Sequence, residues 1–308
     1  MSRQAKQCLL TEPGSVSIAR LITRMELRPY RNLVPDSPLH RHLEHLLREN
    51  CGRVSAATVC EEVLQLRAAE PGLAETLTAT LIEGDFRLRV NGGGVLEWAE
   101  ETAEEVWRTC QRFAVVDVET TNGSREEQRI IELGVSVVEG GQVSREWASL
   151  LNPERPVPYW VQQLTGISNT EVQAAPRFAD VLPRLLDDLE DAILVAHHAR
   201  FDVACLNGEL SRVLSKRLVN RYLCTVELSR HLLPGSRNYG LETLSRWLGL
   251  RHERPHRAGS DAHATAELFC HLLRTVGAPW ADYLRPRDPG AAQAETEKIV
   301  ETNPTPLS

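Results

Sequence analysis

The sequence predicts an α/β domain with a mixed sheet flanked by helices, preceded by a small α+β domain. Residues 113–119 form a short, apolar and β-branched run, which is typical of a buried strand. Residues 129–139 and 143–151 are two further strand-like segments, and Gly140 and Gly141 between them indicate a hairpin turn. Because helical segments and another strand follow this meander, we expect a sheet that is not purely parallel.

The later elements of this domain are predicted from hydrophobic periodicity and from turn residues. A fourth strand is expected at 192–197. The expected helices cover residues 159–164, 169–175, 178–190, 201–214, 225–233, 241–248 and 261–275. We place the bounds of the whole domain at residues 112–280.

Residues 36–100 form a separate predicted domain of three short helices and a hairpin. Ser37 and Pro38 begin the first helix, Ser55 is in position to cap the second, and the third follows Pro71. The third helix has leucines at fourfold spacing, namely Leu73, Leu77 and Leu81. Alternating segments on either side of the NGGG turn at 91–94 predict a β-hairpin.

This order of elements resembles a winged-helix module, with the third helix in the recognition position and the hairpin as the wing. The third helix, GLAETLTATLIEG, contains no Lys or Arg. That composition weakens an interpretation as a reader of the DNA major groove. We therefore favour a protein-contact or structural role for this domain over DNA binding.

Three other segments complete the predicted organisation. Residues 1–35 show little sustained periodicity and are interpreted as a partly ordered leader. Residues 101–111 are an acidic connector. The tail at 286–308 is rich in Pro, Ala, Glu and Thr and is predicted to be disordered, because it offers no face that can pack.

The composition is that of a globular protein, with 42% hydrophobic and 25% charged residues among 308. The formal net charge of −7 argues against a generally basic coat for nucleic acid, although it leaves room for a local basic groove. The seven cysteines form no C-x-x-C pair, so neither a zinc ribbon nor a disulfide framework is indicated, and reduced thiols are expected.

The N-terminus lacks the long apolar core of a signal peptide. No apolar run approaches the ~20 residues of a membrane span. We therefore expect a cytoplasmic protein with no membrane partner.

Asp117 and Glu119 lie two positions apart in the first predicted strand. Alternate strand residues point to the same face, so both carboxylates can reach one metal cluster. A D-x-E pair on an edge strand could instead face solvent. The preceding FAVV run is wholly apolar and indicates a central strand, where two neighbouring carboxylates are costly without a cation.

Asp202 and Asp261 each lie at or near the start of a predicted helix. Asp202 follows the fourth strand after a short turn, which places it near the same sheet edge as Asp117 and Glu119. An Asp at a helix start is also a common capping residue, so each position taken alone has two interpretations.

Taken together, these segments resemble the DEDDh exonuclease superfamily, of the DnaQ-like and RNase T-like kind, over residues 113–275. Asp117 and Glu119 fit its first motif, D-x-E-T-T. Asp202 fits the second, H-N-A-x-F-D, except that a histidine at 198 replaces the usual Asn. The third motif, H-R-A-x-x-D-A, is matched by His256 and Asp261.

Two further matches refine the resemblance. Leu164-Thr165-Gly166-Ile167 is similar to a recurrent element that lies near the terminal nucleotide in this family. A related subgroup has Tyr where this chain has Arg257, so the histidine subgroup fits better. The resemblance implies an RNase H-like fold and assigns substrate contacts to Thr120, Thr121, Leu164, Thr165, His198 and Phe201.

The resemblance implies catalysis by two divalent cations, Mg²⁺ or Mn²⁺, bound to Asp117, Glu119, Asp202 and Asp261. Two such ions activate water on one side of a phosphodiester and stabilise the departing 3′ oxygen on the other. His256, expected on a mobile loop that contains Gly259, would take the proton from the attacking water. Imidazole is suited to this task because it titrates near neutral pH.

The resemblance therefore implies a metal-dependent 3′→5′ exonuclease that releases nucleoside 5′-monophosphates from DNA, in replication proofreading or repair. The pattern looks closest to polymerase III epsilon-type proofreading domains, so single-stranded DNA 3′ ends are the expected partner. A polymerase or repair protein is a second expected partner. An RNase T-like or oligoribonuclease-like activity on RNA is the nearest alternative, and a binding module with a vestigial nuclease site is another.

Overall fold

The computed structural model describes residues 30, 32–99, 112–121 and 127–276. The predicted connector and the predicted disordered tail lie outside these residues, as does most of the leader. The cysteines within the described segments are free, which agrees with the expected reduced thiols. No helix within those segments combines the length and the apolarity needed to cross a membrane.

The central element is a five-stranded mixed sheet in the order β10-β8-β5-β6-β7. Its strands are β5 (Arg112–Thr120), β6 (Ile130–Glu139), β7 (Gln142–Leu150), β8 (Ile193–Ala196) and β10 (Tyr222–Cys224). β5, β6 and β7 form an antiparallel meander, and β5 pairs in parallel with β8 on its other side. The predicted α/β class and its mixed sheet are confirmed, and β5 is central as its apolar sequence indicated.

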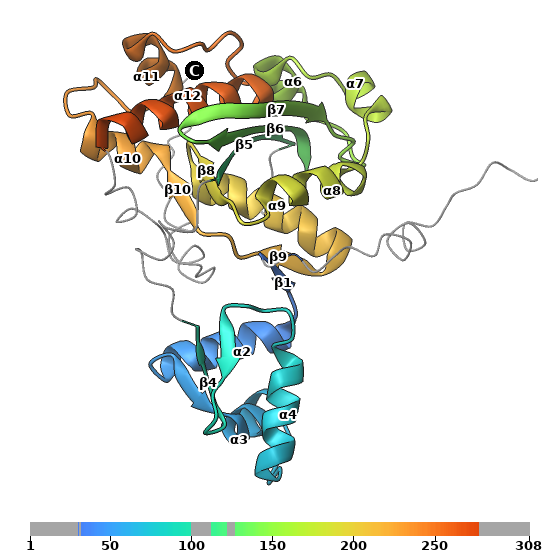
Figure 1. Cartoon of the computed structure of the whole chain (residues 1–308). Helices are drawn as coiled ribbons and strands as arrows, with labels where there is room; N and C mark the ends of the chain where they lie inside the picture. Colours follow the sequence, from blue (N-terminus) through green and yellow to red (C-terminus); the bar gives the residue numbers. More distant parts are fainter. Residues whose placement is uncertain (1–29, 31, 100–111, 122–126, 277–308) are drawn as a thin grey trace, which may run out of the picture.

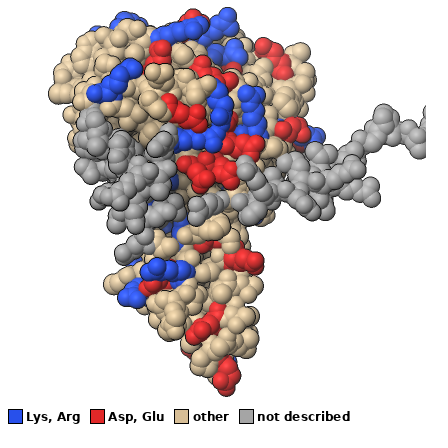
Figure 2. Space-filling view, in the orientation of Figure 1, with Lys and Arg blue, Asp and Glu red and all other residues tan. Residues whose placement is uncertain are grey.

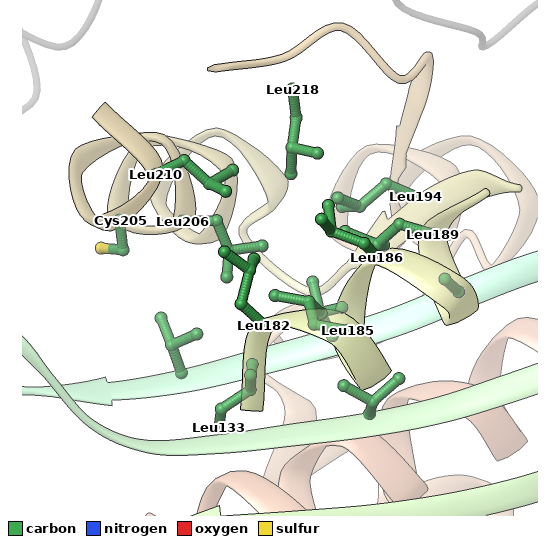
Figure 3. Close-up of a cluster of buried hydrophobic side chains, with 14 of the residues drawn as sticks. Leu133, Leu182, Leu185, Leu186, Leu189, Leu194, Cys205, Leu206, Leu210 and Leu218 are labelled. Atoms are coloured by element: carbon green, nitrogen blue, oxygen red, sulfur yellow. The ribbon is translucent and has the colours of Figure 1, made fainter. Parts of the chain in front are cut away.

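Helices cover both faces of this sheet (Figure 1). One face packs against α8 (Phe178–Leu189) and α9 (Ala199–Leu214), and Figure 3 shows the leucines of these helices gathered over the strands. The other face packs against α10 (Thr225–Leu232) and α12 (Ala258–Val276). The remaining helices of this region are α6 (Tyr159–Thr165), α7 (Asn169–Ala174) and α11 (Leu241–Leu248).

Alternation along β5 assigns its side chains to these two layers. Ala114, Val116 and Val118 enter the core beneath α8 and α9, while Phe113 and Val115 enter the core beneath α10 and α12. Asp117 and Glu119 continue the second series, because they have the same parity as Phe113 and Val115. The two carboxylates therefore lie on the α12 side of the sheet, where β5 ends.

The smaller N-terminal unit contains helices and a three-stranded sheet in the order β2-β4-β3. Its elements are α2 (Pro38–Glu49), β2 (Arg53–Ser55), α3 (Ala56–Thr58), the π-helix η1 (Val59–Val63), α4 (Pro71–Leu81), β3 (Leu88–Val90) and β4 (Val95–Trp98). The expected hairpin is confirmed by the antiparallel pairing of β3 and β4. The winged-helix resemblance and the proposed domain bounds stay predictions.

The buried face of α4 differs from the leucine pattern in its sequence. Leu73 is 53% exposed, whereas Ala74 and Thr78 are buried against the rest of the unit. Ala74 packs with Ala56 and Cys60, where α3 and η1 pass close to α4. The small side chains allow this close approach, while Leu77 and Leu81 are partly buried and pack against the same unit.

A strand pairing absent from the sequence expectations joins the two parts of the molecule. β1 (Leu33–Pro35), within the predicted leader, pairs antiparallel with β9 (Lys216–Leu218), which follows α9. Leu33 also enters the core beneath α8 and α9. This pairing lies at the junction of the N-terminal unit and the sheet (Figure 1), so residues 33–35 are part of the larger fold.

Candidate active site

Asp117 and Glu119 are cross-strand neighbours of two residues of β6. In the antiparallel register Asp117 lies opposite Gly134, and Glu119 lies opposite Glu132. Three carboxylates and a glycine therefore share one small area of the sheet. The area is next to the N-terminal end of α12, whose first residues approach Gly134 closely.

Asp202 reaches this area from the opposite layer. It lies in the first turn of α9, directly after β8, and only 4% of it is exposed. Its carboxylate accepts hydrogen bonds from backbone N–H groups, including that of Val118 in β5. β8 pairs with β5 only as far as Val115, so the N–H of Val118 is free of that ladder and can hold Asp202.

Asp261 occupies the first turn of α12, and both of its carboxylate oxygens have partners. Oδ1 accepts a hydrogen bond from Nε2 of His252 at 2.6 Å. Oδ2 accepts one from the backbone N–H of His256 at 3.1 Å. Asp261 is therefore held by the segment that precedes its own helix.

His256 is an exposed residue just before α12, with a backbone φ of +62°. Ligand atoms of Glu119, His256 and Asp261 all lie within 4.8 Å of one another. The structure thus brings together all five residues predicted to be catalytic, namely Asp117, Glu119, Asp202, His256 and Asp261.

Burial raises the pKa values of all four acids, and the charges of neighbouring acids raise those of Asp117 and Glu119 further. Burial and the charges of Asp261, Glu132 and Asp202 raise the pKa of Glu119 to about 8. Burial raises the pKa of Asp202 to about 7, against the effect of its backbone hydrogen bonds. The pKa of Asp117 is also raised well above its usual range, by burial and then by the charges of the other acids, and burial raises that of Asp261.

This electrostatic pattern fits divalent cations. Four carboxylates that oppose each other's ionisation become compatible when cations lie between them. Carboxylate oxygens are the ligands that hard cations such as Mg²⁺ prefer. The donor set therefore suits the ions that the sequence predicted.

A pocket of about 220 Å³ opens directly beside the acids. Glu119 belongs to both the acid cluster and the pocket wall. The other lining residues are Val118, Thr120, Gln128, Trp160, Val161, Leu164, Thr165 and Phe201. Three of these side chains are large, apolar and about half exposed, namely Trp160, Leu164 and Phe201. The wall can therefore accept a flat apolar group next to the carboxylates.

Of the six predicted substrate contacts, Thr120, Leu164, Thr165 and Phe201 line this pocket. The structure does not bring Thr121 or His198 to it. Thr121 is buried, and its hydroxyl accepts a hydrogen bond from the backbone N–H of Arg129.

His198 is the N-cap residue of α9 and lies edge-to-face with His197. Burial and then the charge of Arg230 lower the pKa of His198, which favours its neutral form. His197 is buried between Thr225 and the backbone carbonyl of Tyr239, and its pKa is lowered to about 3, mainly by burial. Neither histidine joins Glu119 and Asp261.

Three residues at the site were not singled out from the sequence. They are Glu132, which lies across from Glu119, His252, which holds Asp261, and Trp160, which lines the pocket. Glu132 has a detectable signal, because alternation places it on the same face of its strand as Gly134. His252 has none, because its partner is set by the path of the loop before α12.

A family model for exonucleases of the RNase T type matches residues 114–269. This range covers half of the 308 residues and includes all five predicted catalytic residues. The chain belongs to the exonuclease family. The resemblance inferred from the three short motifs is confirmed at this level, and the members of this family depend on divalent metal ions.

Among the curated relatives of this exonuclease family member is the 3′-5′ exonuclease DinG of Bacillus subtilis (strain 168). It is 40% identical over 167 residues, which are 54% of this chain and 18% of the relative. The DNA polymerase III subunit epsilon of Aquifex aeolicus is 32% identical over 171 residues, 56% of this chain and 83% of the relative. The chain thus spans most of the epsilon subunit but less than a fifth of DinG.

A solved structure titled Exonuclease X in complex with 5′ overhanging duplex DNA also resembles the chain. The sequence identity is 26% and the TM-score is 0.44, over 54% of this chain and 93% of that one.

Proposed function

We propose that this protein is a metal-dependent 3′→5′ exonuclease that hydrolyses the terminal phosphodiester of single-stranded DNA and releases nucleoside 5′-monophosphates. The observation that carries the proposal is the convergence of four acids and His256 beside a pocket with apolar walls. A vestigial site would not need to retain every member of such a set.

The pocket suits the 3′-terminal nucleotide. Trp160 and Phe201 offer exposed aromatic surfaces, and bases stack on aromatic side chains without regard to sequence. Because Glu119 lines the pocket and also contacts the acid cluster, a nucleotide held there would have its phosphate near the carboxylates. The pocket would thus select the end of a strand.

Asp117, Glu119, Asp202 and Asp261 would hold two divalent cations, Mg²⁺ or Mn²⁺. When bound, such ions offset the charge of the carboxylates and stabilise the negative charge that develops on the phosphodiester during hydrolysis. The raised pKa values of Glu119 and Asp202 mean that proton release accompanies cation binding near neutral pH.

His256 is in position to act as the general base. It is exposed, its ring lies beside Glu119 and Asp261, and it can take a proton from an attacking water. The water oxygen forms a bond to phosphorus as the bond from phosphorus to the 3′ oxygen of the preceding nucleotide breaks. The departing 3′ oxygen takes up a proton from solvent, so the products are a nucleoside 5′-monophosphate and a strand that ends one nucleotide earlier with a 3′-hydroxyl.

DNA is proposed as the polymer because the relatives that cover this domain include a DNA polymerase III subunit. By the same reasoning the cellular role belongs to DNA replication or repair, with a polymerase or repair protein as partner. Figure 2 shows acidic and basic side chains mixed over one face of the molecule, without a continuous basic surface.

The decisive assay uses 5′-labelled and 3′-labelled single strands of DNA and RNA, with Mg²⁺, Mn²⁺ or EDTA. We expect 5′-labelled DNA to give a ladder that shortens from its 3′ end, and 3′-labelled DNA to release a labelled mononucleotide at once. EDTA should abolish both. Full activity after demetallation, or cleavage of a closed circular strand, would contradict the proposal. Faster cleavage of RNA would reassign the polymer but keep the reaction.

A further inference from the structure

Glu132 is a buried carboxylate, 4% exposed, that lies one strand away from Glu119. It accepts hydrogen bonds from Nε and Nη2 of Arg257 at 3.0 and 2.9 Å, and from the backbone N–H of Ala258 at 2.9 Å. Both of its oxygens are thus engaged by the two residues that follow His256. Glu132 is therefore suited to hold this segment of the chain.

The adjacent β6 residue on the same face, Gly134, completes the contact. A Cβ at Gly134 would overlap the backbone carbonyl of Ala258. Gly259 in turn lies so close to β7 that an added Cβ would be 2.8 Å from the Cβ of Ala148. Gly259 therefore serves close packing of the α12 N-terminus on the sheet, which corrects the expectation that it marks a mobile loop.

His256 lies immediately before these contacts, in a backbone conformation that non-glycine residues rarely adopt. Its φ of +62° lies in the left-handed region, which few non-glycine residues enter, although His enters it more readily than most. Such conformations persist where the surroundings fix them, and they are concentrated at functional sites. The segment is fixed on one side by Glu132 and Gly134 and on the other by the bond from the His256 N–H to Asp261.

We propose that Glu132 and Gly134, here called the β6 anchor, are positioning residues that set the place of the His256 ring for proton transfer. The inference rests on the proposed role of His256 as general base. Glu132 acts through the guanidinium of Arg257 and the backbone N–H of Ala258, so its proposed role is to support this segment and not to bind a cation. Gly134 acts by allowing the segment to lie directly on β6.

The test is a double-mutant cycle between Glu132→Ala and His256→Ala on the full chain. Alone, Glu132→Ala should lower kcat about 10–100-fold, as loss of a supporting contact typically does. KM for single-stranded DNA and the affinity for Mn²⁺ measured by calorimetry should stay close to those of the parent, because Glu132 is proposed to act on the position of His256 and not on a cation. In the His256→Ala background, Glu132→Ala should cause little further loss, because residues that act as a unit are not additive.

Several outcomes would overturn the inference, and they differ from failure of the proposed function. An equal loss from Glu132→Ala in both backgrounds would mean that Glu132 acts independently of His256. A loss of Mn²⁺ affinity that accounts for the activity would assign it to the cation site. If His256→Ala itself turned over at the parental rate, the role of His256 in the proposed function would fail first, and the anchor with it.

Two variants guard against an effect on folding. Gly134→Ala changes the same contact without removing a charge, and it should give the same drop in kcat and the same dependence on His256. Glu139→Ala is the matched control, because Glu139 is an exposed residue at the other end of the same strand, where it pairs with Arg112 at 3.5 Å. It should leave kcat unchanged. If a correctly folded Gly134→Ala variant kept the kcat of the parent, the proposed role of Gly134 in positioning His256 would be wrong.

Discussion

Nε2 of His252 donates a hydrogen bond to Oδ1 of Asp261 across 2.6 Å. The imidazole side chain is only 7% exposed, so this bond is shielded from water. The second oxygen of Asp261 is held by the His256 N–H, and the orientation of the carboxylate is thereby fixed before a cation arrives. Groups that hold a metal ligand in this way tune affinity even though they do not touch the ion.

The first prediction is that His252→Ala weakens cation binding. The variant frees the Asp261 carboxylate to rotate, and we expect the affinity for Mn²⁺ to fall about 10–100-fold. Calorimetric titration of Mn²⁺ into the metal-free protein measures the change directly. His45→Ala is the control, because His45 forms an exposed pair with Glu49 at 3.2 Å. Unchanged Mn²⁺ affinity in His252→Ala would show that Asp261 needs no such support.

The second prediction concerns pH and metal removal. Folding raises the pKa of Glu119 from 4.5 to about 8 and that of Asp202 from 3.8 to about 7. The folded state therefore binds more protons than the unfolded state between these values, and stability is lost as pH rises. In EDTA, the unfolding temperature should fall between pH 5 and pH 8, as the two groups ionise over about that window. Saturating Mg²⁺ should flatten this dependence, and an equal slope with and without Mg²⁺ would refute it.

The third prediction follows from the same repulsion. Asp117→Asn removes one of four crowded charges, so the metal-free protein should become more stable while hydrolysis is lost. If the loss of this repulsion raises the free energy of unfolding by about 1 kcal/mol, the unfolding temperature should rise by about 2–4 °C in a domain of this size. Calorimetry in EDTA at pH 8 checks the stability, and the strand-shortening assay checks the activity. A less stable variant would mean that Asp117 is held by contacts that outweigh repulsion.

Asp117 and Glu119 were predictable from alternation in one strand, whereas Asp202, His256 and Asp261 were assigned through the resemblance of three short motifs to the DEDDh exonucleases. The mixed sheet was predictable from local pattern, since β5, β6 and β7 are consecutive and joined by short turns. What depends on a few neighbouring residues can be read from a single chain.

The unpredicted features depend on residues that are far apart in sequence. β1 and β9 are three-residue strands whose pairing joins positions 33–35 to 216–218, and neither segment has a strand pattern long enough to detect. The Glu132–Arg257 pair spans 125 positions. The spacing of the leucines in α4 does not show that Ala74 and Thr78 are its most buried residues, because their burial depends on how closely α3 and η1 approach the helix.

The fourth prediction tests the pocket. Trp160 is 51% exposed and lines the wall next to Glu119, so Trp160→Ala should remove a surface on which the terminal base stacks. Stacking on an aromatic side chain contributes about 1–3 kcal/mol per base, and we expect KM for single-stranded DNA to rise by a matching factor. Steady-state kinetics on short oligonucleotides measure this effect. Trp247→Ala is the control, since Trp247 is equally exposed, lies on α11 and does not line the pocket. If Trp160→Ala and Trp247→Ala had a similar KM, the terminal base would not stack on Trp160.

The last prediction concerns the attachment of the N-terminal unit. Glu44 on α2 accepts hydrogen bonds from Nη2 of Arg87, at 2.5 Å within its own unit, and from Arg217 of β9. All three side chains are at most 7% exposed. Glu44→Ala would leave two guanidinium groups buried near each other without this carboxylate, and removing one partner of a buried ion pair typically costs about 3–5 kcal/mol.

Urea denaturation should therefore show a large loss of stability in Glu44→Ala, with β1 and β9 separating earlier than the central sheet. Glu242→Ala is the matched control, because the Glu242–Arg246 pair is exposed on both sides and such pairs contribute about 0–1 kcal/mol. Hydrolysis of short oligonucleotides should survive in both variants in the absence of urea, since Glu44 is remote in the fold from Glu119 and Asp261. Parental stability of Glu44→Ala would mean that the β1–β9 pairing alone holds the two parts together.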